Sequence, residues 1–260
     1  MPDWIAIVLL GIIEGITEFL PISSTGHLLL AEHWLPKQSE LFNVVIQCGA
    51  VLAVIVVFQE KLCHMLAHWQ EAETRDYVGK LAAAFLVTAI GGFTVKKLGF
   101  KLPVDATPVA LALLIGGILF VAVEFALRGK KLQDTISWQL ALILGAAQVL
   151  AAVFPGTSRS GATILIALSL GLARPAATEF SFLLGVPTMM AAGSLEIFHA
   201  LRHPTGEPAH WGMILLGSVV SGIVAFAAVK WLLRYIQTHT FTGFGWYRII
   251  VGALALIFWR

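Results

Sequence analysis

Charged side chains are scarce in this chain of 260 residues. Lysine, arginine, aspartate and glutamate make up 12% of it, whereas soluble domains carry about 25%. Hydrophobic residues account for 58%. This balance argues against a soluble globular domain and indicates an integral membrane protein.

Cysteines and basic clusters are also few, and these absences exclude further classes. Cys48 and Cys63 are too few for a disulfide framework, and we interpret both as packing residues. The net charge is +2 without a basic cluster, which argues against a nucleic-acid partner. The N-terminus has no basic region and no small-residue cleavage pattern, so we expect no cleaved signal peptide.

Long apolar runs recur along the whole chain. A helix needs about 20 apolar residues to cross the hydrocarbon core of a bilayer. Most lysines and arginines lie in the connections between the runs, as expected beside membrane helices. The clearest runs are residues 44–58, 81–95, 104–127, 180–200, 211–233 and 247–259. The sequence therefore predicts an all-α polytopic membrane protein whose surroundings are the lipid bilayer.

Two stretches, residues 11–26 and 145–160, match each other without a gap. Each matched residue recurs 134 positions later: Gly11, Glu14, Pro21 and Ser24 correspond to Gly145, Gln148, Pro155 and Ser158. Three apolar segments follow each stretch. We therefore predict a single membrane domain, residues 1–260, made of two repeats, about 1–132 and 133–260.

Neither stretch is typical of a spanning helix, because polar side chains gather around a central proline. Irregular backbone at membrane depth is tolerated only where it is buried in protein or lines a wet cavity. We expect two re-entrant helical hairpins, residues 4–19 with 25–34 and residues 138–154 with 161–172. Three spanning helices separate them, and because three is odd the second hairpin enters from the opposite side. This predicts inverted repeats, with a polar site near the midplane where they meet.

Glu14 and Glu18 are four residues apart, so their carboxylates lie on one face of a helix. Like charges at this spacing repel, and carboxylates inside a membrane are costly. A divalent cation such as Mg²⁺ or Ca²⁺, a shared proton, or Arg159 would compensate. The pair is therefore a candidate for catalysis and for metal binding; the alternative is that both carboxylates cap nearby backbone donors.

Ser23, Ser24 and Thr25 follow the first proline and should begin the outgoing helix of the hairpin, with His27 in its first turn. A helix N-terminus offers free N–H groups that suit an anion. Capping alone would explain the hydroxyls, but it does not explain a histidine beside two carboxylates. A nucleophile, an acid and a base thus lie within a few residues.

Arg159 stands among hydroxyls and glycines in the second stretch, beside Ser158, Ser160 and Thr163. Its planar guanidinium suits phosphate oxygens; a purely structural pairing with Glu18 is the alternative. Carboxylates and a histidine from one repeat, with an arginine and helix dipoles from the other, suit phosphoryl transfer. Outside these stretches we expect Glu124 to extend toward the membrane surface, and Glu179 either to cap its helix or to line the site.

Both motifs resemble the signatures of a known family, the undecaprenyl-diphosphate phosphatases of bacteria, also called bacitracin-resistance proteins. The similarity covers residues 14–27, 155–163 and 179–187 and continues along the chain. It implies hydrolysis of a C55 polyprenyl diphosphate to the monophosphate and inorganic phosphate, which recycles the lipid carrier of cell-wall synthesis. It also implies a multi-pass protein of the bacterial inner membrane, with a site that opens toward the periplasm.

The resemblance also assigns roles to residues of this chain. The expected catalytic residues are Glu14, Glu18, Ser24 and His27, and the two carboxylates are also the candidate metal ligands, as their spacing indicates. The expected substrate-binding residues are Arg159, Ser158, Ser160, Thr163, Ser23 and Thr25. Asn43 stands where the family often has an acidic residue, which weakens any role of that position in binding metal. Attack by Ser24 and direct attack by water remain alternatives.

The rival function from another class is a transporter or flippase of a polyprenyl phosphate lipid. Inverted repeats with broken helices are a transporter architecture, and paired glutamates can carry protons. A purely structural protein would not need so much charge concentrated at two places. The oligomeric state is open, and a homodimer is one alternative.

Overall fold

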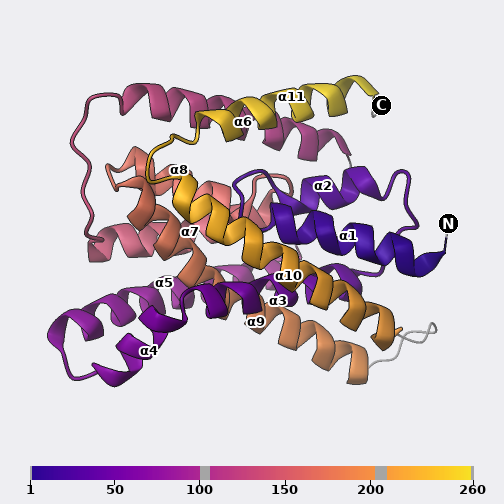
Figure 1. Cartoon of the computed structure of the whole chain (residues 1–260), viewed down its shortest axis with the longest axis horizontal. Helices are drawn as coiled ribbons and strands as arrows, with labels where there is room; N and C mark the ends of the chain where they lie inside the picture. Colours follow the sequence, from indigo (N-terminus) through magenta and orange to yellow (C-terminus); the bar gives the residue numbers. More distant parts are fainter. Residues whose placement is uncertain (1, 100–105, 203–209, 259–260) are drawn as a thin grey trace.

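The computed structural model describes residues 2–99, 106–202 and 210–258, and in these ranges the chain consists of α-helices joined by loops (Figure 1). The helices are α1 Asp3–Thr17, α2 Ser24–Ala31, α3 Glu40–Val57, α4 Gln59–Ala67, α5 Ala72–Lys97, α6 Ala106–Ala126, α7 Trp138–Val153, α8 Arg159–Ser169, α9 Arg174–Arg202, α10 Trp211–Tyr235 and α11 Thr242–Phe258. The predicted all-α fold is confirmed. Residues 104, 105 and 259 of the predicted apolar runs lie outside the described residues.

Five of these helices, α3, α5, α6, α9 and α10, are long and apolar enough to cross a membrane. Helix α11 is also apolar but shorter, with 17 residues. Large apolar side chains cover the outside of the bundle; on α5, for example, Leu86, Ile90 and Phe93 are all exposed. Such a surface is stable in lipid and costly in water, which agrees with the predicted multi-pass membrane protein.

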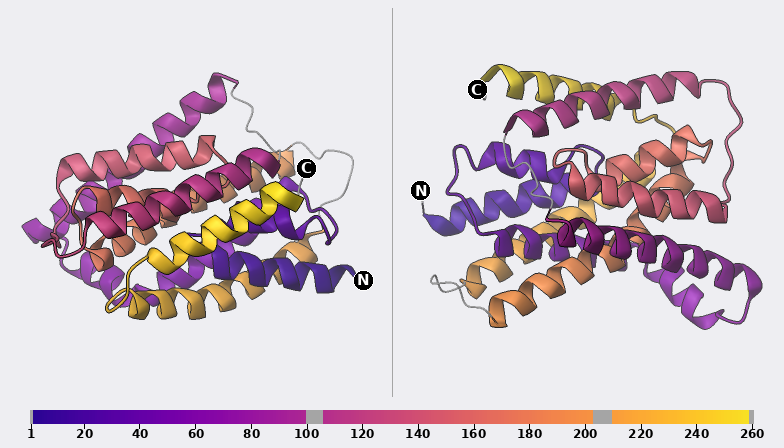
Figure 2. Two further views of the ribbon diagram at one scale, coloured as in Figure 1. Left: turned by 90° about the horizontal axis from the view of Figure 1, so that it is seen from above. Right: turned by 180° about the vertical axis from the view of Figure 1, so that it is seen from behind.

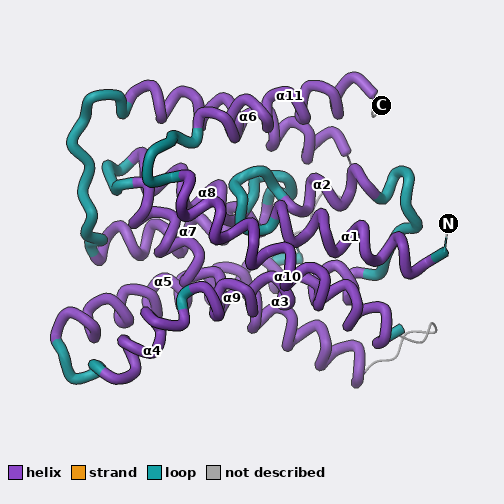
Figure 3. The backbone as a smooth tube through the Cα atoms, in the orientation of Figure 1, coloured by secondary structure: helices purple, strands orange, loops and turns teal. Residues whose placement is uncertain are grey.

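Helix pairs α1–α2 and α7–α8 form the two predicted hairpins, and neither outgoing helix is long enough to span. Helix α2 has 8 residues and α8 has 11, which at 1.5 Å per residue covers only about half of a roughly 30 Å hydrocarbon core. The hairpins enter the bundle from opposite ends, and their loops meet near its centre (Figures 1 and 3). The views from above and behind in Figure 2 show the same arrangement.

The incoming helix of each hairpin packs against a helix of the other predicted repeat. Helix α1 packs against α10, and α7 packs against α5; α3 and α9, and likewise α6 and α11, lie side by side. Small residues permit the close approach: a Cβ atom on Gly15 would lie 2.6 Å from the carbonyl oxygen of Ser221 on α10. A twofold relation between the repeats would produce such an exchange of partners, and the inverted-repeat division itself stays a prediction.

An ion pair with a buried carboxylate fixes one end of the bundle and corrects the expectation for Glu124. This side chain is 2% exposed and does not extend to the membrane surface. Its carboxylate forms an ion pair with Arg174, at the start of α9, and accepts a hydrogen bond from the backbone N–H of Phe241 at 2.8 Å. Arginine binds a carboxylate through two parallel N–H groups, which explains why this carboxylate can be buried in an apolar helix.

Glu179 lies outside the candidate site. Its carboxylate pairs with Lys61 of α4 and accepts a hydrogen bond from the hydroxyl of Tyr77 on α5. It therefore ties the start of α9 to the α4–α5 end of the bundle.

The ion pair between Glu124 and Arg174 yields a stability prediction. Replacing Glu124 by alanine leaves the backbone N–H of Phe241 and the partly buried guanidinium of Arg174 without their acceptor, and a buried donor left unpaired costs about 1–3 kcal/mol. We expect the E124A protein to unfold at a clearly lower temperature in detergent, measured by circular dichroism. The control is E73A, because Glu73 is an exposed carboxylate on α5; its change should stay within about 0.5 kcal/mol. Equal melting temperatures for the two variants would contradict the role of Glu124.

Candidate active site

The two loops at the centre of the bundle end in the same unusual conformation. Ser23 caps α2 with a φ of 74°, and Ser158 caps α8 with a φ of 69°. Each hydroxyl accepts a hydrogen bond from the N–H of a glycine three residues later, Gly26 at 3.2 Å and Gly161 at 3.0 Å. Each outgoing helix therefore begins with a serine cap, which is the alternative reading of the first serine cluster.

This geometry corrects the gapless match of the two stretches by one residue. The structural counterpart of Ser158 is Ser23, and the counterpart of Arg159 is Ser24, because each pair occupies the same position in the cap. The second loop has one more residue between its proline and its capping serine than the first loop has. Ser24 and Arg159 therefore occupy the first position of α2 and of α8.

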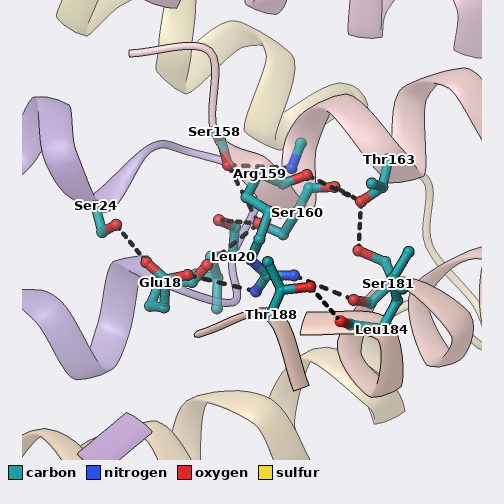
Figure 4. Close-up of polar contacts among 11 residues, drawn as sticks. Glu18, Leu20, Ser24, Ser158, Arg159, Ser160, Thr163, Ser181, Leu184 and Thr188 are labelled. Carbon is teal, nitrogen blue, oxygen red and sulfur yellow. Dashed lines mark hydrogen bonds and ion pairs between the residues drawn. The ribbon is translucent and has the colours of Figure 1, made fainter. Parts of the chain in front are cut away.

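Glu18 receives one side chain from each loop (Figure 4). The Ser24 hydroxyl donates to Oε2 of Glu18 at 2.5 Å, and Nη2 of Arg159 donates to Oε1 at 3.4 Å. All three lie between the two helix N-termini, and Glu18 is buried. The structure thus brings together three of the predicted residues, which come from both repeats.

Arg159 is held by groups on three sides. Its Nη1 donates to the backbone carbonyl of Ser181 on α9 at 3.1 Å, and its guanidinium lies 5.5 Å from the centre of the Phe19 ring. Its Nε is buried, and no described residue accepts a hydrogen bond from it. The guanidinium therefore keeps a donor free while its position is fixed.

Ser160 and Thr163 are fully buried behind Arg159 rather than beside open space. The Ser160 hydroxyl lies 3.2 Å from the carbonyl oxygens of both Glu18 and Leu20, so it joins the second loop to the first. The Thr163 hydroxyl lies 2.9 Å from the Arg159 carbonyl and 2.5 Å from the Ser181 hydroxyl. Both hydroxyls thus hold backbone in place, and their binding to substrate stays a prediction.

The remaining hydroxyls predicted to bind substrate lie differently. Ser23 and Ser158 use their hydroxyls in the caps, and the Ser158 oxygen also lies 3.2 Å from that of Ser160. Thr25 is exposed in the first turn of α2. Contact of these three residues with substrate likewise stays a prediction.

Glu14 is the second carboxylate of the site and is fully buried on α1. No described residue donates a hydrogen bond to either of its oxygens. It precedes Glu18 by one helical turn, so the two carboxylates can share one cation. Oxygen ligands of this kind fit Mg²⁺ or Ca²⁺, although the described residues contain no group of three potential His, Cys, Asp or Glu ligands. Glu14 and Glu18 are thus the residues that would hold a cation.

His27 bonds to groups other than Ser24. Its Nδ1 lies 2.7 Å from the carbonyl oxygen of Ser23, and its Nε2 lies 2.7 Å from the hydroxyl of Tyr247 on α11. Because a carbonyl can only accept, Nδ1 carries the hydrogen, and in the neutral ring Nε2 accepts from the tyrosine. The group that accepts the hydrogen bond of the Ser24 hydroxyl is therefore Glu18, and His27 lies at the edge of the site.

The residues missed at the sequence level come mainly from α11. Tyr247 orients His27, and the next residue, Arg248, contacts both loops. An arginine within an apolar membrane segment indicates function. The apolar run 247–259 contains such an arginine, Arg248, and this could have identified it from the sequence. The carbonyl of Ser181, which accepts from Arg159, has no such signal because it belongs to the backbone.

Taken together, these contacts suit attack on an anionic group. Ser24 offers a hydroxyl that donates its hydrogen bond to a carboxylate, Arg159 offers a guanidinium, and two helices direct their N-termini at the same place. Phosphate oxygens match both the guanidinium and the N–H groups.

Comparison with known proteins gives full-length relatives. The model of a family described as bacitracin resistance protein BacA matches residues 7–254. A protein of Rhizobium etli strain CIAT 652, named undecaprenyl-diphosphatase, is 52% identical over 98% of this chain and 96% of its own length. Proteins of that name from Xanthomonas oryzae pv. oryzae strain PXO99A and Xylella fastidiosa strain Temecula1 are 47% and 48% identical, over 100% and 97% of this chain and 98% and 97% of their own lengths.

The contacts of His27 yield a spectroscopic prediction. In protein labelled with ¹⁵N-histidine, at a pH where the ring is neutral, we expect His27 to show a protonated Nδ1 and an unprotonated Nε2. Tyr247→Phe removes the donor to Nε2 and should shift the Nε2 resonance while Nδ1 stays protonated. The resonances of His27 are identified by their loss in His27→Gln. An Nε2–H tautomer in the wild-type protein would contradict this geometry.

Proposed function

The chain belongs to the bacitracin resistance protein BacA family, and we propose that it is an undecaprenyl-diphosphate phosphatase. The reaction is hydrolysis of undecaprenyl diphosphate to undecaprenyl phosphate and inorganic phosphate. The name of its relatives supports this substrate, and the apolar surface of the bundle suits a substrate that lies in the bilayer. The name also favours hydrolysis over the alternative of a transporter or flippase.

One observation carries the proposed chemistry: the Ser24 hydroxyl donates to Glu18, whose other oxygen accepts from Arg159. A serine becomes a nucleophile when a neighbouring base takes its proton. Phosphoryl transfer further needs the phosphate positioned and its charge neutralised, which an arginine and backbone N–H groups accomplish.

In the first step, Ser24 Oγ forms a bond to the terminal phosphorus, and the bond from that phosphorus to the bridging oxygen breaks. Glu18 takes the hydroxyl proton and passes it to the bridging oxygen, so prenyl monophosphate leaves. Arg159 binds the oxygens of the phosphoryl group that is transferred. The direct contact between Ser24 Oγ and Glu18 Oε2 supports the role of Glu18 as base, because a general base must lie within hydrogen-bond reach of the proton that it takes.

In the second step, water forms a bond to the phosphorus, and the bond to Ser24 Oγ breaks. Glu18 takes one proton of the water and returns it to the serine oxygen, and inorganic phosphate leaves. His27, oriented by Tyr247 at the edge of the site, is proposed as a further acid or base for the departing phosphate. Direct attack by water, with Ser24 as a ligand only, is the alternative.

We also propose that Glu14 and Glu18 hold a divalent cation. The two partnerless oxygens of Glu14 support this, because a buried carboxylate without donors is costly. A bound cation would supply charge neutralisation at the diphosphate. Loss of activity with a chelator, restored by added Mg²⁺ or Ca²⁺, would support it, and full activity of the chelated enzyme would contradict it.

The finer location and assembly are likewise proposals. The resemblance supports a location in the bacterial inner membrane, with the site open to the periplasm. Intact spheroplasts should then release phosphate from a prenyl diphosphate added outside. Release by inverted vesicles alone would contradict this orientation.

We further propose that the protein associates into a homodimer. Light scattering of the detergent-solubilised protein measures its mass, and the mass of one chain would contradict the dimer.

Phosphate release from a soluble short-chain prenyl diphosphate tests the proposed function directly. Detergent-purified protein should release phosphate without a sealed membrane, which a transporter would not do. Ser24→Ala and Glu18→Gln remove the nucleophile and the base, and each should lower kcat about 10²–10⁴-fold. Arg159→Ala removes a phosphate donor and should lower kcat/KM about 10²–10³-fold.

The matched control is Ser169→Ala, which removes an exposed hydroxyl from α8, the helix that Arg159 begins. Its activity should stay within about twofold of wild type, since surface changes of this kind alter little. Absence of phosphate release by the wild-type protein would overturn the proposed function. Near-normal activity of Arg159→Ala would overturn the assignment of the site.

A further inference from the structure

Arg248 is a fully buried arginine on α11 whose hydrogen bonds all go to backbone carbonyls. No described carboxylate forms an ion pair or a hydrogen bond with it. Its acceptors are the carbonyl oxygens of Leu113 at 3.4 Å, Pro21 at 3.0 Å, Thr157 at 3.1 Å from each of Nη1 and Nη2, Ala112 at 3.1 Å and Gly156 at 3.3 Å. Since a buried charge is costly, this concentration of acceptors requires an explanation.

The acceptors belong to three parts of the chain that the sequence separates widely. Pro21 lies in the loop of the first hairpin, and Gly156 and Thr157 lie in the loop of the second hairpin. Ala112 and Leu113 belong to α6. One guanidinium therefore joins both loops to each other and to a spanning helix. Lysine could not do this, because its single nitrogen cannot reach acceptors spread around a planar fork.

Both loops need such support because each ends in a serine with positive φ. Ser23 and Ser158 are the non-glycine residues with positive φ among those described. That conformation costs about 1–3 kcal/mol and persists only where the surroundings impose it. The carbonyls bound by Arg248 belong to Pro21, two residues before Ser23, and to the two residues directly before Ser158.

Glycines make room for this guanidinium. A Cβ atom on Gly116 of α6 would collide with Nη2 of Arg248, and one on Gly161 would lie 2.9 Å from Nη1. Ordinary van der Waals contact with a carbon requires about 3.5 Å or more. The space around Arg248 is therefore matched to its side chain from α6 and from α8.

From these contacts we propose that Arg248 is a positioning residue for the diphosphate site, which rests on the proposed function. It holds the two loops in one relative position, so that Ser24 and Arg159 act on the same phosphoryl group. Carbonyl dipoles solvate its charge without cancelling it, and the remaining positive charge behind the two loops favours an anionic substrate. A merely structural arginine would stabilise the fold without affecting how the site binds phosphate.

Arg248→Lys distinguishes these roles through kinetics with a short-chain prenyl diphosphate. Loss of loop position should raise KM and lower kcat, and displacement of catalytic groups by about 1 Å costs about 10²-fold in rate. In the Arg159→Ala background the same change should lower kcat/KM less than about threefold, because the effects of two residues that act through one another are not additive. The expected result is therefore a large loss in kcat/KM in the wild-type background and a small loss beside Arg159→Ala.

The matched control is Arg174→Lys, which alters an arginine that forms several hydrogen bonds with Glu124 outside the site. Arg174→Lys should lower the melting temperature but leave KM unchanged. Any decrease in kcat/KM that it causes should be by the same factor in the wild-type and in the Arg159→Ala protein. If Arg248→Lys does not fold, Gly116→Ala displaces Nη2 from the side of α6 and should raise KM in the same way. Wild-type KM in the Arg248→Lys or Gly116→Ala protein, or equal losses in both backgrounds, would overturn the proposal.

Hydrogen exchange separates failure of this inference from failure of the proposed function, because it needs no activity. In Arg248→Lys, peptides that cover residues 18–26 and 154–161 should exchange faster together, while Arg174→Lys leaves both unchanged. If the wild-type protein releases no phosphate, the proposed function fails and exchange alone tests whether Arg248 joins the loops. Unchanged exchange, or a change in one loop alone, would overturn the inference.

Discussion

At the centre of the bundle, the two carboxylate oxygens of Glu18 accept hydrogen bonds from Ser24 and Arg159, the first residues of α2 and α8. These helices belong to different halves of the chain and enter from opposite ends. Neither can reach across a bilayer, so each must end in irregular backbone at depth, where every polar group needs a partner inside the protein. The contact at Glu18 therefore marks the place where two helix N-termini meet, and such N-termini suit an anion.

The surrounding residues follow from that requirement. Capping by Ser23 and Ser158 satisfies N–H groups at the two helix starts, and the Ser160 hydroxyl bonds across to the first loop. Arg248 donates hydrogen bonds to loop carbonyls, and buried carbonyls of this kind need a donor inside the protein. Residues that bind backbone groups thus lie next to the residues proposed to act on substrate, and substitution of the first kind should displace the second.

Much of this arrangement could be predicted from sequence, because its signals are local. A proline among serines between apolar runs indicated each hairpin, and the spacing of Glu14 and Glu18 placed both carboxylates on one face. The convergence of Glu18, Ser24 and Arg159 followed from the repeat. What could not be predicted depends on distance or on backbone conformation: Arg248 meets Pro21 from 227 positions away, and the one-residue difference between the loops shows only in the positive φ of the capping serines. Glu124 was wrongly expected to reach the membrane surface, because its partner Arg174 belongs to another helix.

The most direct test of the central claim is a rapid-quench single turnover with prenyl diphosphate labelled in its terminal phosphate. If both loops act on one phosphoryl group, the label should appear transiently on Ser24, and Arg159→Ala should slow its appearance about 10²-fold or more. Label that never appears on Ser24 would contradict attack by Ser24, and label that appears there at the wild-type rate in Arg159→Ala would contradict a single site built from the two loops.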